Sequence, residues 1–174
     1  MKMGLEAVDK GQRSAAADML LFRALRDRLG FSRLTSAATG GAALGPDTFR
    51  FFQAMGVPLR QLYGQTELLG AYTLHRAGEV DFDSVGVAFD ETIEVRVDQP
   101  DANGVGEIVT RHPNMFAGYL GVDDIPDLRD GWLHTGDAGY HRPDGRLVVI
   151  DRIKDIAETS TGTRFSPQYI ENKL

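Results

Sequence analysis

The segment QLYGQTE, at positions 61–67, places a glycine, an amide, a hydroxyl and a carboxylate in four consecutive positions. Thr66 can donate a hydrogen bond to a phosphate oxygen, and Glu67 offers the hard carboxylate oxygen that suits Mg²⁺. A loop or a helix cap would use the same residue types without any ligand. The segment therefore indicates a phosphate and metal site, with a simple loop or cap as the alternative.

Two glycine-containing segments carry a second kind of chemistry. Gly40, Gly41 and Ala42 have no side chain larger than a methyl group, so a flat ring or a phosphate can approach their backbone. A tight turn before a helix is the alternative for this segment. Asp137 follows Gly136 in GWLHTGD, and a fixed carboxylate can accept two hydrogen bonds from a vicinal diol such as that of ribose. A surface turn with a packed tryptophan is the alternative there.

The segment DRIKD, at positions 151–155, holds four charges in five residues. Arg152 and Lys154 can meet phosphate or ribose, although most such charge runs are solvated linkers. Other chemistries lack support. The chain has no cysteine, its four histidines show no metal-ligand spacing, and it contains no GxSxG, P-loop or dinucleotide fingerprint.

The composition is that of a globular protein. The 174 residues are 42% hydrophobic and 25% charged, which allows a sizeable core. Twenty-five acidic residues against 19 basic ones give a net charge of -6, and general nucleic-acid binding needs a basic face instead. No apolar run approaches the roughly 20 residues of a membrane span. We therefore expect a cytoplasmic protein that binds no nucleic acid, with peripheral membrane contact left open.

The elements expected to position these residues are helices and short strands in the first part of the chain and mainly strands after about residue 85. Helix caps, glycine stops and short apolar runs predict a helix over 14–29, a strand over 33–38, a helix over 46–56 and a strand over 59–63. A short helical crossover makes the two strands parallel, so TGGA and GQTE should meet at one sheet edge. After about residue 85, alternating residues at 93–98, a return strand at 107–111 and a hairpin around RPDG predict antiparallel sheet or a small barrel. Ser166 and Pro167 predict the start of a further helix.

Taken in order, five segments resemble the adenylate-forming, AMP-binding acyl-CoA synthetases. They are TGGAALGPDTFRFF, QLYGQTE, GEIVTRHPNMFAGYL, GWLHTGDAG and DRIKDIAETSTGTRFSPQYIE. The resemblance covers about residue 25 to the end and is greatest to the bacterial long-chain fatty acid–CoA ligases. It implies an α/β fold: part of the family's large domain, with a parallel α/β layer over 1–70 and a β-rich, barrel-like subdomain over 71–150. Residues 151–174 would hold the hinge and the start of the small C-terminal domain.

The resemblance also implies an activity and a role for each site residue. The family converts an acid and ATP to an acyl-adenylate and pyrophosphate, and then forms the thioester with coenzyme A. The implied roles are as follows: Gly40, Gly41 and Ala42 line the adenine and acyl pocket, Tyr63 stacks on adenine beside Gly64 and Gln65, Thr66 contacts the α-phosphate, Glu67 holds Mg²⁺, Asp137 binds the ribose hydroxyls near Arg152, and Lys154 is the hinge.

Two features of the family are missing from this sequence: its Ser/Thr/Gly-rich phosphate loop and its late catalytic lysine. We therefore expect a part of a longer ligase that turns over little or nothing by itself. Two alternatives stay open. One is a non-catalytic nucleotide-binding or interaction module derived from the family. The other is a ligase for an aryl, amino or short-chain acid.

Overall fold

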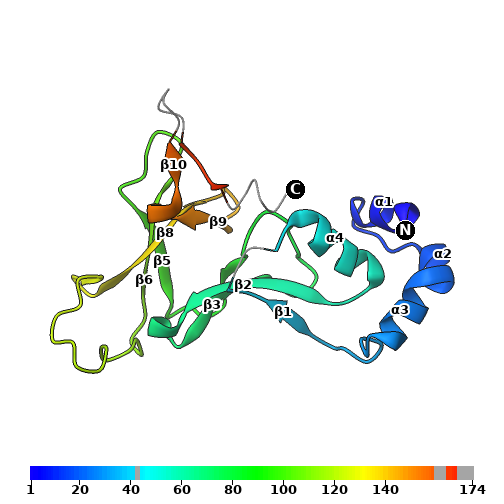
Figure 1. Cartoon of the computed structure of the whole chain (residues 1–174), viewed down its shortest axis with the longest axis horizontal. Coiled ribbons are helices and arrows are strands. Elements are labelled where there is room, and N and C mark those ends of the chain that lie inside the picture. The colour runs from blue at the N-terminus through cyan, green and yellow to red at the C-terminus, as the bar shows by residue number, and fades with distance from the viewer. Residues whose placement is uncertain (42–43, 159–163, 168–174) are drawn as a thin grey trace. The chain divides into compact units, whose positions relative to one another are not determined.

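The computed structural model describes residues 1–41, 44–158 and 164–167, and it divides the chain into two compact units (Figure 1). Unit 1 comprises Met1–Gln61 and unit 2 comprises Leu62–Leu174. The elements of unit 1 are α1 (Lys2–Val8), α2 (Ala15–Ala17), the π-helical turn η1 (Asp18–Phe22), α3 (Arg23–Arg28), β1 (Ala37–Thr39), α4 (Pro46–Met55) and the first part of β2 (Leu59–Gln65).

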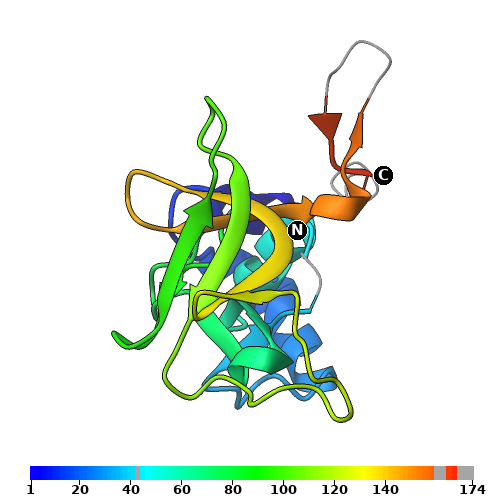
Figure 2. The same ribbon diagram turned by 90° about the vertical axis from the view of Figure 1, so that its left-hand side faces the viewer.

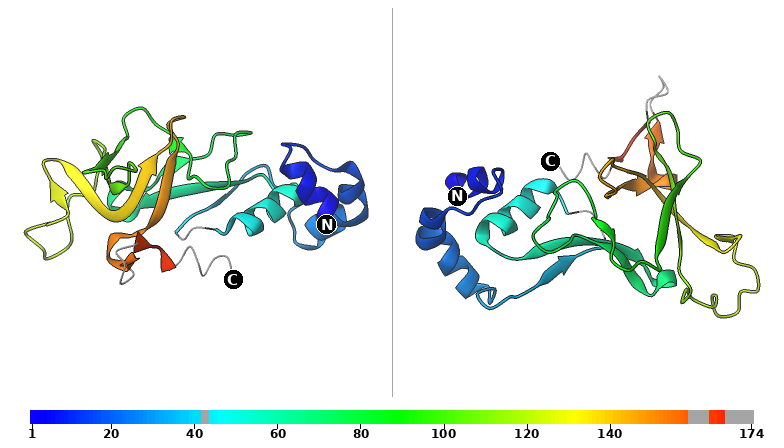
Figure 3. Two further views of the ribbon diagram at one scale, coloured as in Figure 1. Left: turned by 90° about the horizontal axis from the view of Figure 1, so that it is seen from above. Right: turned by 180° about the vertical axis from the view of Figure 1, so that it is seen from behind.

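The helices of unit 1 follow the caps in the sequence. Ser14 begins the helical run, and its hydroxyl accepts a hydrogen bond from the Ala17 amide at 3.2 Å. Pro46 opens α4, and Gly56 ends it in the left-handed conformation with φ 83°. The predicted helix over 14–29 is confirmed, with one π-helical turn inside it. The helix α1 was not predicted, and Figure 3 shows it beside α4.

Aromatic packing forms the core of unit 1. Phe22 and Phe49 are fully buried, and the ring of Phe22 meets that of Phe51 edge-on, with 6.2 Å between their centroids. Gly4 of α1 lies against Phe22, where an added Cβ would stand 2.4 Å from the ring. The missing side chain at Gly4 therefore lets α1 pack closely against this core.

The predicted parallel pair is confirmed within unit 1. β1 and β2 run parallel, with Ala37 opposite Leu59 and Thr39 opposite Gln61. The predicted bounds of both strands were wrong. β1 covers only Ala37–Thr39, and β2 continues past Tyr63 to Gln65. Pairing with the next strand explains the extension, because it satisfies backbone groups that a loop would leave to water.

Unit 2 is built mainly from strands (Figure 2), and the antiparallel sheet predicted after about residue 85 is confirmed. Its elements are the end of β2, the 3₁₀ turn η2 (Thr66–Leu68), β3 (Gly70–Leu74), β4 (Val87–Ala88), β5 (Glu94–Asp98), β6 (Gly106–Arg111), β7 (Leu128–Arg129), β8 (Trp132–His141), β9 (Leu147–Arg152), the 3₁₀ turn η3 (Ile153–Asp155), β10 (Ala157–Glu158) and β11 (Arg164–Phe165). β2, β3 and β4 pair antiparallel, as do β5, β6, β8 and β9 in that order, and β7 pairs with β8.

The core of unit 2 lies between these strands. Val85, Ile108 and Leu147 are buried together, with Tyr63 and Val95 packed against them. The alternation over 93–98 is confirmed, since Val95 and Val97 are half-buried while Glu94 and Arg96 are exposed. β8 contains all of WLHTGD, so the alternative of a surface turn there is wrong.

The predicted helix after Ser166 falls largely outside the described residues. No helix in the described part of the chain is both long and apolar enough to cross a membrane. The mixed α/β fold class predicted from the sequence is confirmed.

Candidate functional site

The carboxylate of Asp137 is the centre of a polar cluster inside unit 2. Its side chain is only 8% exposed. Oδ2 accepts a hydrogen bond from the Tyr63 hydroxyl at 2.5 Å and another from Nε2 of Gln65 at 3.3 Å. Oδ1 pairs with Nε of Arg152 at 3.0 Å. Four residues that the sequence singled out on three separate segments therefore lie together.

The hairpin of β8 and β9 brings two of them face to face. Its register places Asp137 opposite Arg152, and Pro143 lies in the turn between the strands. The backbone carbonyl of Thr135 adds a second common partner, because it accepts from Gln65 Nε2 at 3.0 Å and from Arg152 Nη1 at 3.1 Å. Arg152 keeps half of its side chain exposed, so the cluster opens to solvent on that side.

Burial controls the electrostatics of the cluster. Loss of water raises the pKa of the Asp137 carboxyl, while the Tyr63 hydrogen bond and the positive charge of Arg152 act to lower that pKa. Burial also raises the pKa of the Tyr63 hydroxyl, so that group stays a neutral donor at physiological pH. The cluster is a fixed carboxylate that is held by donors on both oxygens.

Glu67 and Thr66 form the neighbouring part of the site. Both lie in η2, directly after β2, with Thr66 exposed and Glu67 half-buried. Oε1 of Glu67 accepts a hydrogen bond from the Tyr119 hydroxyl at 2.6 Å, and this bond raises the pKa of Tyr119 to about 12. The Glu67 carbonyl accepts from the Phe116 amide at 2.9 Å, which ties η2 to the segment that carries Tyr119.

Gly64 has a structural reason to be glycine. It pairs with Ala71 of β3 at a register shift, and an added Cβ would stand 1.9 Å from the Gly70 carbonyl oxygen. The close pairing lets β3 follow η2 closely, and it fixes Gln65 at the end of β2 and Thr66 at the start of η2. Gly64 therefore has a structural role in the strand pairing, and its contact with a ligand stays a prediction.

The remaining predicted residues are Gly40, Gly41, Ala42 and Lys154. Gly40 and Gly41 follow β1 in unit 1, both are exposed, and Gly41 has φ 88°. Ala42 lies outside the described residues. Lys154 is exposed in η3, two residues after Arg152. An adenine pocket lined by the glycines and a hinge at Lys154 both stay predictions.

The side chains of this site fit a metal ion that is already coordinated by phosphate oxygens and water. No group of three or more histidine, aspartate or glutamate side chains in the described ranges could cage an ion. Mg²⁺ in nucleotide sites is commonly held by one or two carboxylates, with phosphate oxygens and water completing the octahedron. Glu67 can supply one such carboxylate, so the residues present fit Mg²⁺ bound to a nucleotide.

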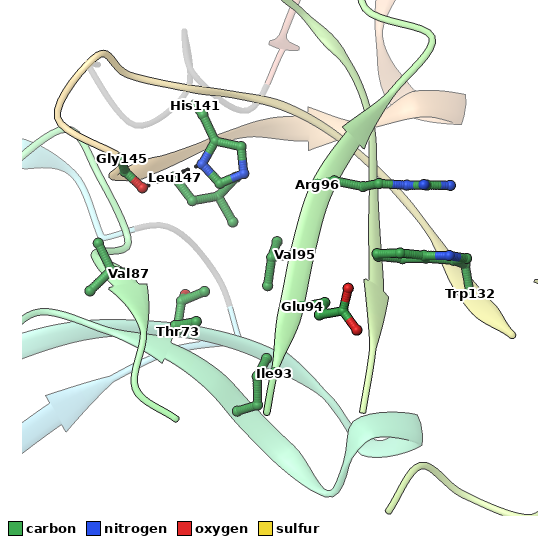
Figure 4. A pocket seen from close by; sticks show the side chains of 11 residues that line it. Thr73, Val87, Ile93, Glu94, Val95, Arg96, Trp132, His141, Gly145 and Leu147 are labelled. Atoms are coloured by element: carbon green, nitrogen blue, oxygen red, sulfur yellow. Dashed lines mark hydrogen bonds between the residues drawn. The ribbon is translucent and has the colours of Figure 1, made fainter. Parts of the chain in front are cut away.

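A separate cavity of about 500 Å³ lies among β3, β4, β5, β8 and β9 (Figure 4). Val87, Val95 and Leu147 line it, together with the buried Thr73. The Trp132 ring, also at its border, lies under the guanidinium of Arg96, whose Cζ is 3.9 Å from the ring centroid. None of the site residues predicted from the sequence lines this cavity.

The sequence had assigned no role to three residues that hold the site. Tyr119 binds Glu67, Thr135 binds Gln65 and Arg152 through its carbonyl, and Glu107 contacts the backbone just before Asp137. Glu107 and Tyr119 lie in GEIVTRHPNMFAGYL, a segment that contributed to the resemblance. The glycine, acidic and aromatic residues of this segment were the available signal for a role in the site. The spacing of residues in the sequence does not identify partners that lie 29 or 52 residues apart.

Comparison with known proteins assigns the family. Residues 8–120, more than half of the chain, match the model of the AMP-binding enzyme family. The long-chain-fatty-acid–CoA ligase ACSBG2 of Xenopus laevis is 34% identical over 161 residues, which are 91% of this chain and 22% of that protein. The ligase heimdall of Drosophila melanogaster is 35% identical over 156 residues, covering 86% of this chain and 22% of its own length. Long chain acyl-CoA synthetase 1 of Arabidopsis thaliana is 34% identical over 170 residues, with coverage of 91% and 26%.

Solved structures agree on the fold. The o-succinylbenzoate CoA synthetase of Bacillus subtilis, in complex with its acyl-adenylate intermediate, superposes with a TM-score of 0.73 at 23% identity, over 88% of this chain and 33% of that one. The chain thus spans about a quarter of the curated relatives and a third of this structure. The match over residues 8–120 shows that the chain belongs to the AMP-binding enzyme family, and within it the chain is similar to the three ligases above.

Proposed function

We propose that the chain supplies the ribose-side and metal-side wall of the adenylate site in an ATP-dependent fatty acid–CoA ligase. One observation carries the proposal: the buried Asp137 carboxylate, held by Tyr63, Gln65 and Arg152. A carboxylate fixed in this way presents two acceptor oxygens at a constant spacing, as the 2′- and 3′-hydroxyls of a ribose require. The exposed Arg152 gives the same site positive charge for the nearby phosphate.

The reaction demands charge neutralisation and alignment more than a protein nucleophile. An oxygen of the substrate carboxylate attacks the α-phosphorus of ATP, the bond to the β-phosphate oxygen breaks, and pyrophosphate leaves. The thiolate of coenzyme A then attacks the acyl carbon, and AMP leaves with the bonding electron pair. Asp137 would hold the ribose through both steps, and Thr66 would donate to an α-phosphate oxygen.

Mg²⁺, when bound, would neutralise charge on the phosphates, and Glu67 is the residue that would hold it. Tyr119 orients the Glu67 carboxylate by its hydrogen bond to Oε1. The metal assignment and the role of Thr66 rest on the types and order of these residues in η2.

A long-chain fatty acid is the acid that we propose. The three relatives described above carry that specificity in their names, at 34–35% identity. The structures of aryl-acid ligases match at under 25% identity and so support the fold alone. The names of the same relatives support coenzyme A as the acceptor of the acyl group in the second step. A cytoplasmic location with peripheral membrane contact stays a prediction from the sequence.

Nucleotide binding by the chain tests the proposal directly. Titration calorimetry with AMP should show saturable binding, and Asp137→Asn should weaken it about 10-fold or more, because one charged acceptor of the diol is lost. Asp144→Asn is the matched control, since Asp144 lies in the turn of the same hairpin with its side chain 42% exposed. No saturable binding, or equal affinities for AMP in the wild type and Asp137→Asn, would refute the ribose role.

The metal role has its own measurement. Glu67→Gln should weaken ATP binding in the presence of Mg²⁺ and leave ATP binding in EDTA unchanged, since only the metal-bound form uses the carboxylate. Equal ATP affinities of both proteins at limiting Mg²⁺ would remove this role. Because the chain spans about a quarter of its relatives, we expect binding without turnover. Robust pyrophosphate release from ATP, Mg²⁺ and a fatty acid would contradict that expectation and exclude a non-catalytic module.

A further inference from the structure

The carboxylate of Glu107 contacts both ends of the short segment that precedes Asp137. Glu107 lies in β6, opposite Ala138 of β8. Its Oε1 accepts the Gly136 amide at 3.1 Å, and its Oε2 pairs with Nδ1 of His134 at 2.8 Å. The side chains of Glu107 and His134 are 25% and 12% exposed, so both contacts are shielded from water.

The segment needs such a contact because the ladder between β6 and β8 is irregular there. Glu107 pairs with Ala138 and Val109 pairs with His134, so one residue of β6 faces three residues of β8. Gly136 adopts φ 70°, a conformation that few other residues tolerate. A bulge of this kind removes ladder partners from its amides. Glu107 supplies the missing acceptor for the Gly136 amide.

Thr135 closes the other side of the same bulge. Its hydroxyl donates to the Ile108 carbonyl at 2.6 Å and accepts from the Asp137 amide at 3.1 Å. The backbone that leads into Asp137 is therefore tied to β6 through one side chain of each strand, Glu107 and Thr135. A bulge that is bonded in this way aims the next side chain in a single direction.

We propose that Glu107 is a positioning residue: by holding His134 and the Gly136 amide, it fixes the bulge that directs the Asp137 carboxylate toward a ribose diol. The inference rests on the proposed function for its ligand, whereas the contact itself is independent of that function. A diol is bound by two acceptors only while their spacing and direction are kept, so a small relaxation of the bulge costs the diol contact first. In the described part of the chain Glu107 bonds to neither Tyr63 nor Thr66, so base and phosphate contacts through those two residues should persist.

A pair of nucleotides separates positioning from a general loss of structure. AMP carries both ribose hydroxyls, and 2′,3′-dideoxyadenosine monophosphate lacks both. Glu107→Ala should weaken AMP binding about 10-fold and leave the dideoxy nucleotide unchanged, so that the preference for AMP falls. Glu107→Gln keeps an acceptor for the Gly136 amide and should hold AMP affinity within about threefold. The matched control is Glu94→Gln on β5, whose carboxylate binds Arg111 on the exposed side.

Equal weakening of both nucleotides by Glu107→Ala, or no change in either, would overturn the proposal. A wild-type chain that does not distinguish the nucleotides would refute the ribose role and leave Glu107 to be tested by NMR. The Gly136 amide proton should then move upfield in Glu107→Ala, and the Asp137 carboxyl carbon should shift with it. Glu94→Gln should move neither. If both resonances stay in place in Glu107→Ala, the positioning role is wrong whether or not nucleotide binds.

Glu107→Gln carries the test if Glu107→Ala does not fold. A neutral acceptor replaces a charged one, so the Gly136 amide proton should still move upfield by a measurable amount. The preference for AMP should fall by up to about threefold. An unchanged amide resonance together with an unchanged preference would overturn the proposal.

Discussion

The hydrogen bond between Tyr63 and Asp137 makes a quantitative prediction about stability. Tyr63→Phe removes only the hydroxyl, which donates to Oδ2 at 2.5 Å, and leaves the ring packed edge-on against Tyr72. A hydrogen bond to a charged group contributes roughly 1.5–3 kcal/mol, more when the group is shielded from water. The Asp137 side chain is only 8% exposed. We therefore expect the free energy of unfolding of unit 2 to fall by about 2 kcal/mol, or about 30-fold in the unfolding equilibrium.

The penalty should depend on pH in a defined direction. Burial raises the folded-state pKa of Asp137 above its unfolded value, so the folded state binds more protons in between and stability falls as pH rises through that window. The Tyr63 hydroxyl opposes this rise of the pKa. Tyr63→Phe should raise the folded-state pKa of Asp137 further. The loss of unfolding free energy caused by Tyr63→Phe is therefore small below the pKa of Asp137 in the unfolded state, about 4. It is complete above the folded-state pKa.

Urea unfolding followed by tryptophan fluorescence measures this effect. Trp132 is the sole tryptophan of the sequence and lies in β8 with Asp137, so it reports on unit 2. The matched control is Tyr119→Phe, which removes the same kind of bond, to Glu67 at 2.6 Å, from a tyrosine that is 44% exposed. That variant should stay within about 0.5 kcal/mol of wild type. Equal losses in the two variants, or a Tyr63→Phe penalty that is as large at pH 3.5 as at pH 7, would refute the reasoning.

Two further predictions concern the strands around the site. Thr73→Val should stabilise unit 2 by about 1 kcal/mol in urea unfolding, because the buried Thr73 hydroxyl has no hydrogen-bond partner in the described part of the chain; a loss of stability would show that water or another group satisfies it. Gly64→Ala should cost about 2–3 kcal/mol or more, since the new Cβ would stand 1.9 Å from the Gly70 carbonyl; wild-type stability in thermal unfolding would mean that β2 and β3 pair less closely than described.

Local chemistry explains which parts of the fold could be predicted from the sequence. Proline and glycine around Asp144 define the turn between β8 and β9, and a turn fixes the register of its hairpin. His141 opposite Leu147 follows by counting outward from that turn. One further irregularity, between Ala138 and Gly139, then changes the count. The hairpin was predictable, but the exact partner of each residue depends on a bulge that no local pattern marks.

Contacts between distant segments explain what could not be predicted. The chain gives Tyr63 an aromatic ring and a hydroxyl, and the sequence indicated only the ring as a stacking surface. Its hydroxyl meets Asp137 across 74 residues, a pairing that forms only when the end of β2 meets β8 in the folded unit. The end of β2 was misplaced for the same reason, because its last residues pair with β3, which the sequence did not indicate.

The Tyr63 hydroxyl links two parts of the proposed nucleotide site. Tyr72, fully buried, holds the Tyr63 ring at a centroid distance of 5.1 Å, and Asp137 holds its hydroxyl. A carboxylate has about four acceptor positions, and Tyr63, Gln65 and Arg152 occupy three. A ribose diol needs two, so one donor must leave. Gln65 has the longest of these contacts, 3.3 Å, and keeps the Thr135 carbonyl at 3.0 Å when it does so. The proposed site would therefore accept a diol by releasing Gln65 alone, while Tyr63 keeps both its ring and Asp137 in place.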